Sequence, residues 1–427
     1  MNQKEIKVYG YRWVVLAVFA SVQCGLHILW ATFLPITGDV AAFYDVTPLA
    51  IGFLSMSFMI LYIFVSLPSS WIIFRYGIRN GVGFGVIIMG VFGLLRGVIG
   101  DNYTGVVVCT VAIAISQPLI VNSITTMSAR WFPENERATA TGLAMLAQFI
   151  GIMGGMVITP FLAEAVGIKA TLLTYGIFVG ILCVLFFLLY REHPATPPAL
   201  AAEKEEPLCI RDGFKNMFKT RDAVLVLIIF SIGLTIFNTV STWIEQILAP
   251  RGFSPIEAGS LGGVMMLGGI LGCVILPLIS DKIGKRKVFI LIGLLVITPC
   301  LLGITYFQGL FLILVAGGIL GFFQLGMAPI VMEAAADVSK PSTEATTQGV
   351  LMMFGQGLSV FGIFLTDYYR SENSEMTPFL LVFVGMVILN LIIATRLSEP
   401  RLMGQKTSTA SATESGNVKQ SIPAVQE

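Results

Sequence analysis

Charged residues are scarce in this sequence: Asp, Glu, Lys and Arg together make up 12% of the 427 residues. Soluble domains carry about 25% charged residues, so a chain with half that share cannot present a water-compatible surface. Hydrophobic residues make up 56% of the chain, and lipid is therefore its expected solvent. The net charge of only +1 argues against a nucleic-acid partner, which would need a concentrated basic face.

Motifs for cofactor or nucleotide binding are also missing. No phosphate-binding P-loop occurs, and Gly81, Gly83 and Gly85 lie inside an apolar run where they favour close helix packing. No nucleophile stands beside a base, so we expect neither an enzyme nor a bound cofactor. The cysteines stand singly, without the spacing of a metal site or a disulfide framework. They are Cys24, Cys109, Cys183, Cys209, Cys273 and Cys300.

Long apolar runs dominate what the chain does contain. A helix needs about 20 apolar residues to cross a bilayer, and backbone groups in lipid must bond within their own segment, which favours helices. The fold class predicted is an all-α membrane protein with twelve transmembrane helices. The expected spans are 12–37, 47–72, 80–99, 104–130, 138–163, 168–190, 222–248, 256–279, 287–307, 309–334, 345–367 and 375–396.

The basic residues predict the orientation of these spans. With the N-terminus inside, 22 of the 26 Lys and Arg residues fall on the inner side. Cytoplasmic loops carry such an excess, so both termini should be cytoplasmic, in a multi-pass protein of the cell membrane. The four outer exceptions are Arg96, Lys169, Arg251 and Arg370.

The chain contains an internal repeat with an offset of 207 residues. This shift superimposes Gly77 on Gly284, Arg79 on Arg286 and Gln117 on Gln324. Further matches are Ala138-Thr139 with Ala345-Thr346, Gly142 with Gly349, and Gly155 with Gly362. Two parallel six-helix halves related by an axis along the membrane normal would produce this pattern. The expected divisions are a bundle over 1–192, a cytoplasmic linker over 193–221, a bundle over 222–398 and a disordered tail over 399–427.

Polar side chains in mid-span are candidates for a solute pathway. A polar group facing lipid is costly, so each should face a partner helix or a watery cavity. Helix packing remains the alternative for each of them, and for His27 in particular, while Trp243 reads as an interfacial anchor. The candidates are Gln23, His27, Trp30, Gln117, Asn122, Gln148, Asn238, Glu245, Gln324, Glu333 and Gln356.

The loop between spans eight and nine carries the most specific motif. Asp281, Gly284 and the cations Lys285 and Arg286 stand together after Pro277. This resembles the signature loop of the major facilitator superfamily, which implies two pseudo-symmetric six-helix halves and transport by alternating access. A carboxylate beside cations at a helix end can form contacts that hold a gate shut. Anchoring by positive charge alone would explain the cations without the Asp and the Gly.

The first-half counterpart of this loop departs from the pattern. It keeps Gly77 and Arg79, but Phe74 stands where the resemblance implies an acid. Arg130 and Arg137 flank a mixed-charge segment after span four that suits an inner latch. The predicted gating residues are Asp281, Gly284, Lys285, Arg286, Gly77, Arg79, Arg130 and Arg137.

A narrower resemblance covers most of spans one to five and ten to eleven. The chain is similar to the feline leukaemia virus subgroup C receptor family, whose members carry choline and ethanolamine and were earlier linked to haem. The residues that carry it are Arg12-Trp13, Trp30, Phe43-Tyr44, Leu54-Ser55-Met56, Pro68-Ser69-Ser70-Trp71, Gly77-Ile78-Arg79, Gln117, Trp131-Phe132, Gly321-Phe322-Phe323, Pro329, Glu333 and Gln356.

This resemblance implies roles for individual residues. Trp30 would be the cation–π face of a binding site, with Gln117 and Gln356 as neutral hydrogen-bond partners and Glu333 as a balancing acid. The Tyr expected in span seven is Asn238 here, which makes a primary amine, a zwitterion or a polar solute as plausible as choline. Gln324 and His27 complete the predicted substrate-binding set.

Three functions remain open from the sequence. The first is alternating-access transport of a small polar or cationic organic solute by a monomer in the lipid bilayer. The second is an organic-anion or drug antiporter of the same fold, in which Arg96 or His27 meets the substrate. The third is a membrane receptor or sensor that does not transport. Competition by solutes of different charge would separate the first two, and counterflow would exclude the third.

Overall fold

A computed structural model describes residues 9–194, 215, 217–339, 344–373 and 376–398 of the chain. The predicted disordered tail lies outside the described residues, as does most of the predicted linker. The α-helices are α1 (Arg12–Ala31), α2 (Thr37–Tyr44), α3 (Pro48–Val98), α4 (Tyr103–Val121), α5 (Ile124–Trp131), α6 (Glu134–Val166), α7 (Ile168–Leu189), α9 (Arg221–Thr242), α10 (Ile244–Leu248), α11 (Pro255–Ile283), α12 (Arg286–Tyr306), α13 (Leu310–Val338), α14 (Glu344–Asn373) and α15 (Thr377–Thr395). Short 3-10 turns η1 (Leu34–Ile36) and η2 (Ala249–Arg251) follow α1 and α10.

Eleven helical segments among the described residues are long and apolar enough to cross a membrane. One of them, α3, is 51 residues long and holds two of the predicted spans. Its path breaks at Gly77, where φ is 83° and ψ is 172°. That backbone conformation strains any residue with a Cβ atom, which accounts for the glycine. Counted on both sides of this break, the helices reproduce the twelve predicted spans, and the all-helical fold class is confirmed.

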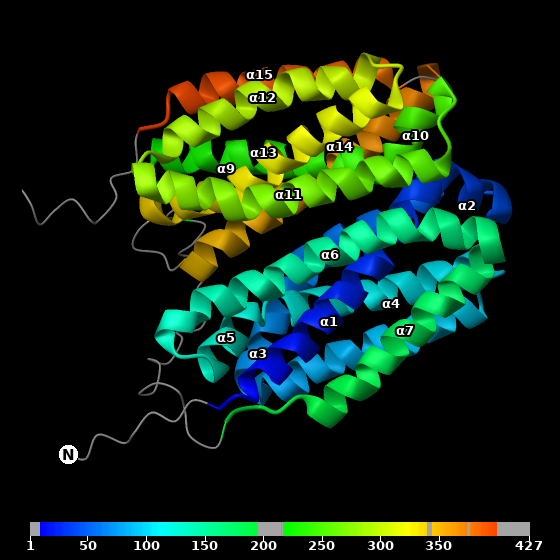
Figure 1. The fold of residues 1–427 in the computed structure, drawn as a ribbon, viewed down its shortest axis with the longest axis vertical. Coiled ribbons are helices and arrows are strands. Elements are labelled where there is room, and N and C mark those ends of the chain that lie inside the picture. Colours follow the sequence, from blue (N-terminus) through cyan, green and yellow to red (C-terminus); the bar gives the residue numbers. More distant parts are fainter. Residues whose placement is uncertain (1–8, 195–214, 216, 340–343, 374–375, 399–427) are drawn as a thin grey trace, which may run out of the picture.

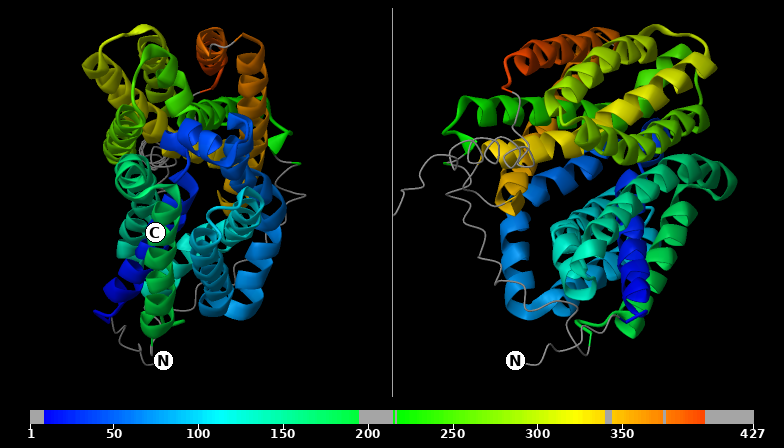
Figure 2. Two further views of the ribbon diagram at one scale, coloured as in Figure 1. Left: turned by 90° about the vertical axis from the view of Figure 1, so that its right-hand side faces the viewer. Right: turned by 60° about the vertical axis from the view of Figure 1, so that its left-hand side comes forward.

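The helices assemble as two groups that lie one above the other in Figure 1. Helices α1 to α7 pack among themselves, and α9 to α15 form the second group. The groups touch chiefly where α6 packs against α11 and where α3 packs against α14. Figure 2 shows the same two groups from the side, with the long α3 reaching across toward the second group. We call the group α1–α7 the first half and α9–α15 the second half.

The loops that contain Gly77 and Gly284 mark one end of the molecule. We call the end that carries Gly77 and Gly284 the inner end, since the sequence predicts it to be cytoplasmic. The opposite end, where α2 and α10 meet at the right of Figure 1, is the outer end. Gly284 closes α11 with φ of 72°, the same left-handed half of conformational space as its repeat partner Gly77.

The repeat is visible in side-chain packing as well as in sequence. A Cβ added to Gly155 of α6 would lie 3.2 Å from the carbonyl oxygen of Ile28 in α1. A Cβ added to Gly362 of α14 would lie 2.7 Å from Cγ2 of Thr235 in α9. Both the glycines and the residues they meet are 207 positions apart, so the two halves use the same close helix contact.

Two predicted spans are shorter than expected. Span one ends as a helix at Ala31, and span seven ends at Thr242, because each is followed by a separate short helix. Trp243, interpreted from sequence as an interfacial anchor, is instead fully buried at this break. Its indole N–H donates to the carbonyl oxygen of Ile363 at 3.3 Å, and its ring packs against Gly52 of the first half. Burial between the halves, and not contact with headgroups, explains this tryptophan.

Candidate functional site

A cavity of about 950 Å³ lies between the two halves. Helices α1, α3, α4, α5 and α6 of the first half line it, together with α9, α11, α13 and α14 of the second. None of the described residues that line it is Asp, Glu, Lys or Arg. Its polar groups are amides, hydroxyls and one imidazole among aromatic rings and methionines. The size and lining are typical of a site for a small organic molecule.

Six of the seven predicted substrate-binding residues line this cavity. Both members of the repeat pair, Gln117 of α4 and Gln324 of α13, face it from opposite halves. The other four are His27, Trp30, Asn238 and Gln356. The sequence predicted that these residues contribute to one site, and all six line the same cavity.

Glu333 is the predicted binding residue that does not line the cavity. Its carboxylate is half exposed near the inner end of α13, where it lies 2.8 Å from the guanidinium of Arg286. The carboxylate therefore sits at the signature loop and not at the depth of Trp30. A role for Glu333 in balancing a substrate's charge inside the cavity has no geometric support.

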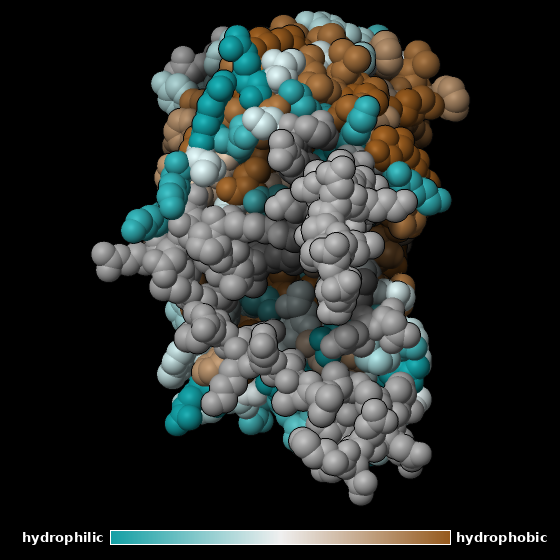
Figure 3. Space-filling model, turned by 90° about the vertical axis from the view of Figure 1, so that its left-hand side faces the viewer, coloured by the Kyte–Doolittle hydropathy of each residue, from teal (hydrophilic) through white to brown (hydrophobic). Residues whose placement is uncertain are grey.

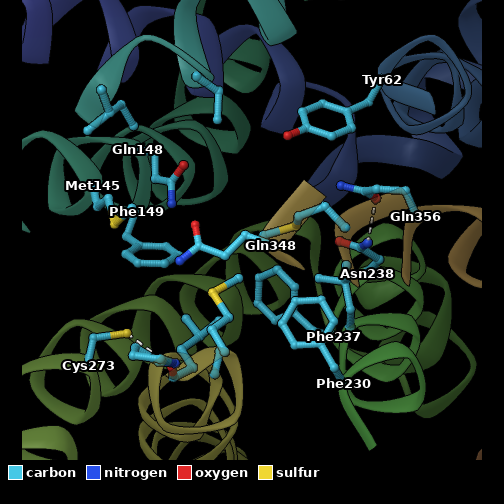
Figure 4. A pocket seen from close by; sticks show the side chains of 18 of the residues that line it. Tyr62, Met145, Gln148, Phe149, Phe230, Phe237, Asn238, Cys273, Gln348 and Gln356 are labelled. Atoms are coloured by element: carbon cyan, nitrogen blue, oxygen red, sulfur yellow. Dashed lines mark hydrogen bonds between the residues drawn. The ribbon is translucent and has the colours of Figure 1, made fainter. Parts of the chain in front are cut away.

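Asn238 joins two helices at the cavity wall. Its Nδ2 donates to Oε1 of Gln356 at 3.2 Å and to Oγ of Ser359 at 3.0 Å. Figure 4 shows the first of these bonds, with Phe230 and Phe237 of the same helix turned into the cavity. Asn238 thus positions Gln356. The neighbouring Phe237 supplies the aromatic face that the family resemblance had led us to expect from a Tyr at position 238.

The repeat offset could have identified Phe237 from sequence. A shift of 207 residues carries Trp30 onto Phe237, and both rings line the cavity from equivalent helices. Tyr62 was also missed, since a single tyrosine in an apolar run gives little signal. Its hydroxyl donates to Oδ1 of Asn122 at 3.0 Å, and Nδ2 of Asn122 donates to Oγ of Ser66 at 3.1 Å.

Arg96 does not line the cavity. Its side chain is fully buried, and Nη1 donates to the carbonyl oxygen of Leu29 at 3.2 Å. Nη2 lies 3.4 Å from Oγ1 of Thr32, and the guanidinium lies over the ring of Phe33. A cation near the carbonyl end of a helix is favourable, so Arg96 supports the last turn of α1, which carries Trp30. Of the two residues that the antiporter alternative offered for contact with the substrate, Arg96 does not reach the cavity and only His27 lines it.

The outer end of the cavity is closed by contacts between the halves. The carboxylate of Glu245 in α10 accepts the backbone N–H of Gly38, at the start of α2, at 2.8 Å. Gln246 donates to the same oxygen at 2.6 Å. Gly38 and Glu245 are 207 positions apart, so they are equivalent in the repeat and their contact lies where the pseudo-symmetry axis meets the outer surface. We call this contact the outer latch.

Glu245 is 6% exposed, and its environment affects its protonation. Burial raises the pKa of the Glu245 carboxyl, and the charge of Asp39 acts in the same direction. The hydrogen bonds from Gln246 and Gly38, and the charge of Arg370, oppose this effect. Arg370 is itself paired with Asp367 at 2.8 Å and lies over Trp243.

The inner end shows contacts of another kind. Glu192, which follows α7, accepts the backbone N–H of Ile78 at 3.0 Å and that of Arg79 at 2.5 Å, and it pairs with Arg130. The acid missing at Phe74 is thus supplied from another helix, and it caps the part of α3 that follows Gly77. Glu192 was not predicted from the sequence, because it lies more than a hundred residues away from that loop.

The second-half loop has its own pairing. Arg286 bonds to Glu333 and Asp337 of α13, while Asp281 has no hydrogen bond or ion pair to any of the described residues. Arg137 donates to the carbonyl oxygen of Phe132 at 3.3 Å, and Lys285 stands at the turn before α12. The pairs of Arg130 and Arg286 each join helices of the same half, so they do not close the inner end across the cavity.

The cavity extends toward that inner end. Its lining includes Ser70 of α3, Gly142 of α6, Pro277 of α11 and Gln348 of α14, each near the inner end of its membrane span. Figure 3 shows the inner face, with hydrophilic side chains visible on both halves. In Figure 4, Gln148 and Gln348 reach toward one another from opposite halves.

Comparison with known proteins agrees with this architecture. The family model for the Major Facilitator Superfamily matches residues 19–363 and, in a second match, 245–420. Solute carrier family 49 member A3 of Danio rerio is 28% identical over 371 residues, which cover 82% of this chain and 76% of that protein. Choline/ethanolamine transporter FLVCR2 of Homo sapiens is 26% identical over 412 residues, covering 89% and 76%. The predicted resemblance to the feline leukaemia virus subgroup C receptor branch is therefore confirmed.

A solved structure shares the fold. The crystal structure of a bacterial homolog to the human lysosomal transporter Spinster, in an inward-facing and unoccupied conformation, superimposes with a TM-score of 0.69 at 16% identity. The match covers 92% of this chain and 95% of the other. The family consists of secondary transporters and not of enzymes, as the sequence predicted. This chain belongs to the Major Facilitator Superfamily and is a multi-pass membrane transporter.

Proposed function

We propose that this transporter carries a small organic ammonium compound, or a small neutral polar solute, by alternating access of the cavity between its halves. The observation that carries the proposal is the charge-free lining with Trp30 and Phe237 on equivalent helices. An aromatic face attracts an organic cation without a fixed carboxylate, and the amides Gln117, Gln324 and Gln356 offer neutral hydrogen-bond partners.

The composition of the cavity argues against a strongly anionic substrate. An anion brought into this site would need a cation or a cluster of donors, and Arg96 is committed to the end of α1. The relatives named choline/ethanolamine transporters carry substrates of the class that the cavity suits. We further propose a monomer in the cell membrane. Both termini are cytoplasmic in this proposal, an orientation that the distribution of Lys and Arg supports.

Transport assays with the purified protein in proteoliposomes test this proposal. Radiolabelled ethanolamine and choline are offered in a counterflow experiment, which a sensor without transport activity would fail. Trp30→Ala and Gln117→Ala should reduce uptake about tenfold or more, because a cation–π contact and a hydrogen bond to a charged group each contribute on the order of 1–2 kcal/mol. Trp71→Ala is the matched control, since that ring is exposed and outside the cavity. Unchanged uptake in both cavity variants would contradict the site.

A further inference from the structure

The geometry of α1 and α4 brings His27 and Gln117 to the same depth. Nε2 of Gln23 in α1 lies 3.5 Å from the carbonyl oxygen of Ile120 in α4, which fixes one level of this helix pair. The helices run in opposite directions, so His27, four residues after Gln23, lies one turn toward the outer end. Gln117, three residues before Ile120, lies about one turn in the same direction. Both side chains line the cavity.

His27 presents a hydrogen-bond acceptor to this space. Its Nδ1 lies 2.8 Å from the backbone oxygen of Gln23, and a carbonyl oxygen only accepts, so Nδ1 carries the proton. A second ring proton would create a buried charge, and no carboxylate lines the described cavity to balance it. Nε2 is then an acceptor, and it has no hydrogen-bond partner among the described residues.

Gln117 supplies a second acceptor. Its Oε1 is buried and makes no hydrogen bond to the described residues, although a buried carbonyl without a partner is costly. Trp30 lies three residues beyond His27 on the same face of α1, one turn farther toward the outer end. The ring of Trp30 and Nε2 of His27 therefore border one part of the cavity, and the unpaired oxygen of Gln117 lies buried in the cavity wall at the depth of His27.

We infer that His27 and Gln117 form an acceptor pair beside Trp30 that selects an ammonium group bearing N–H bonds over a quaternary ammonium group. This inference rests on the proposed function and narrows its substrate class. A primary ammonium donates to both acceptors while its charge faces the ring of Trp30. A quaternary ammonium has no N–H to donate, and its methyl groups leave the oxygen of Gln117 and Nε2 of His27 unpaired. A site with buried acceptors discriminates strongly against a ligand that lacks the matching donor.

Calorimetric titration of the full-length protein in lipid nanodiscs tests this selection, with ethanolamine and choline as the probes. The two compounds share the hydroxyethyl group and differ in the three methyl groups on nitrogen. Ethanolamine should bind about tenfold or more tightly than choline, the ratio expected for hydrogen bonds to a charged group. His27→Phe keeps a ring of similar size but removes the acceptor, so it should weaken ethanolamine and leave choline nearly unchanged. Gln117→Met should also bring the dissociation constants of ethanolamine and choline closer together.

Gln348→Met is the matched control, because it removes a cavity amide from the second half, away from α1 and α4. It should preserve the ratio of the two dissociation constants. Equal binding of both probes by the native protein, or an unchanged ratio in His27→Phe and Gln117→Met, would overturn the acceptor pair while leaving the proposed function standing. Failure of both probes to bind or to be transported would overturn the proposed function, and this inference with it.

Discussion

The two ends of the cavity are held in different ways. At the outer end, the halves touch directly: Glu245 bonds to the first turn of α2, and Trp243 packs on Gly52. At the inner end, Arg130 and Arg286 form their ion pairs within their own halves. A transporter that closes one end at a time forms contacts between its halves at the closed end. At the open end, the same residues bond within their own halves. The outer end is in its closed arrangement here, whereas the ion pairs of Arg130 and Arg286 do not hold the halves together at the inner end.

The largest effect should come from preventing the approach of α6 and α11. A Cβ added to Gly259 of α11 would lie 2.3 Å from the carbonyl oxygen of Met156 in α6, so a larger side chain cannot enter the closed arrangement. Gly259→Leu should shift the population toward an open outer end by about tenfold to hundredfold, the usual scale of overpacking. Spin labels at Ala42→Cys and Ala249→Cys, both exposed at the outer end, would report a longer distance.

Gly385→Leu provides the control for this substitution, because a Cβ there would meet no atom within 4 Å. It should leave the distance between the labels unchanged. If Gly259→Leu gave the same distance distribution as the native protein, the contact between α6 and α11 would not be the closed outer gate.

Removing the outer latch should have a smaller effect. Glu245→Ala leaves the N–H of Gly38 without its acceptor, a loss of about 1–3 kcal/mol for a buried donor. The amides of Thr37–Tyr44 should then exchange with deuterium about tenfold faster. Glu257→Ala is the control, since Glu257 caps α11 within its own half through Ser254. If the amides of α2 exchanged equally fast in the native protein and in Glu245→Ala, the outer latch would not stabilise the closed outer end.

The latch should also respond modestly to pH. Burial raises the pKa of Glu245 in the closed arrangement, and solvation in an open outer end would return it toward its ordinary value. The closed arrangement therefore binds a proton more readily. The stabilisation of the closed arrangement by this proton is fully present below the ordinary pKa of a glutamate. It is lost as the pH rises through the raised pKa of Glu245. Exchange of α2, corrected for the intrinsic pH effect, should slow on acidification. Glu245→Gln should abolish this dependence, and faster exchange in acid would contradict the sign.

The smallest effect is expected at the inner end. Arg286→Met breaks pairs with Glu333 and Asp337 that lie within one half and are partly exposed, so it should lower the free energy of unfolding by about 1 kcal/mol. The distance between the outer spin labels should not change. Thermal unfolding and the label distance, measured on the same sample, would detect any coupling that this account does not predict.

The sequence predicted the helices and much of the cavity because both depend on local signals. Apolar runs set the spans, and the 207-residue offset placed Gln117 and Gln324 on equivalent helices that face the same space. Glu192, Phe237 and the outer latch were missed or misread because they depend on which residues meet across the fold. Glu333 was predicted to lie in the binding cavity, but its helix continues beyond the predicted span to Val338 and carries Glu333 near the inner end. The length of an apolar run does not reveal where its ends lie relative to a cavity.

The most direct test of the account is the labelling of Gln117→Cys and Gln324→Cys by a membrane-impermeant thiol reagent. Native cysteines must be replaced first, because Cys273 itself lines the cavity. In membrane vesicles of defined sidedness, both positions should react from the cytoplasmic side and be protected from the other. Labelling at neither position from either side would contradict a solvent-filled cavity between the halves, and labelling only from the outside would contradict the closed outer end.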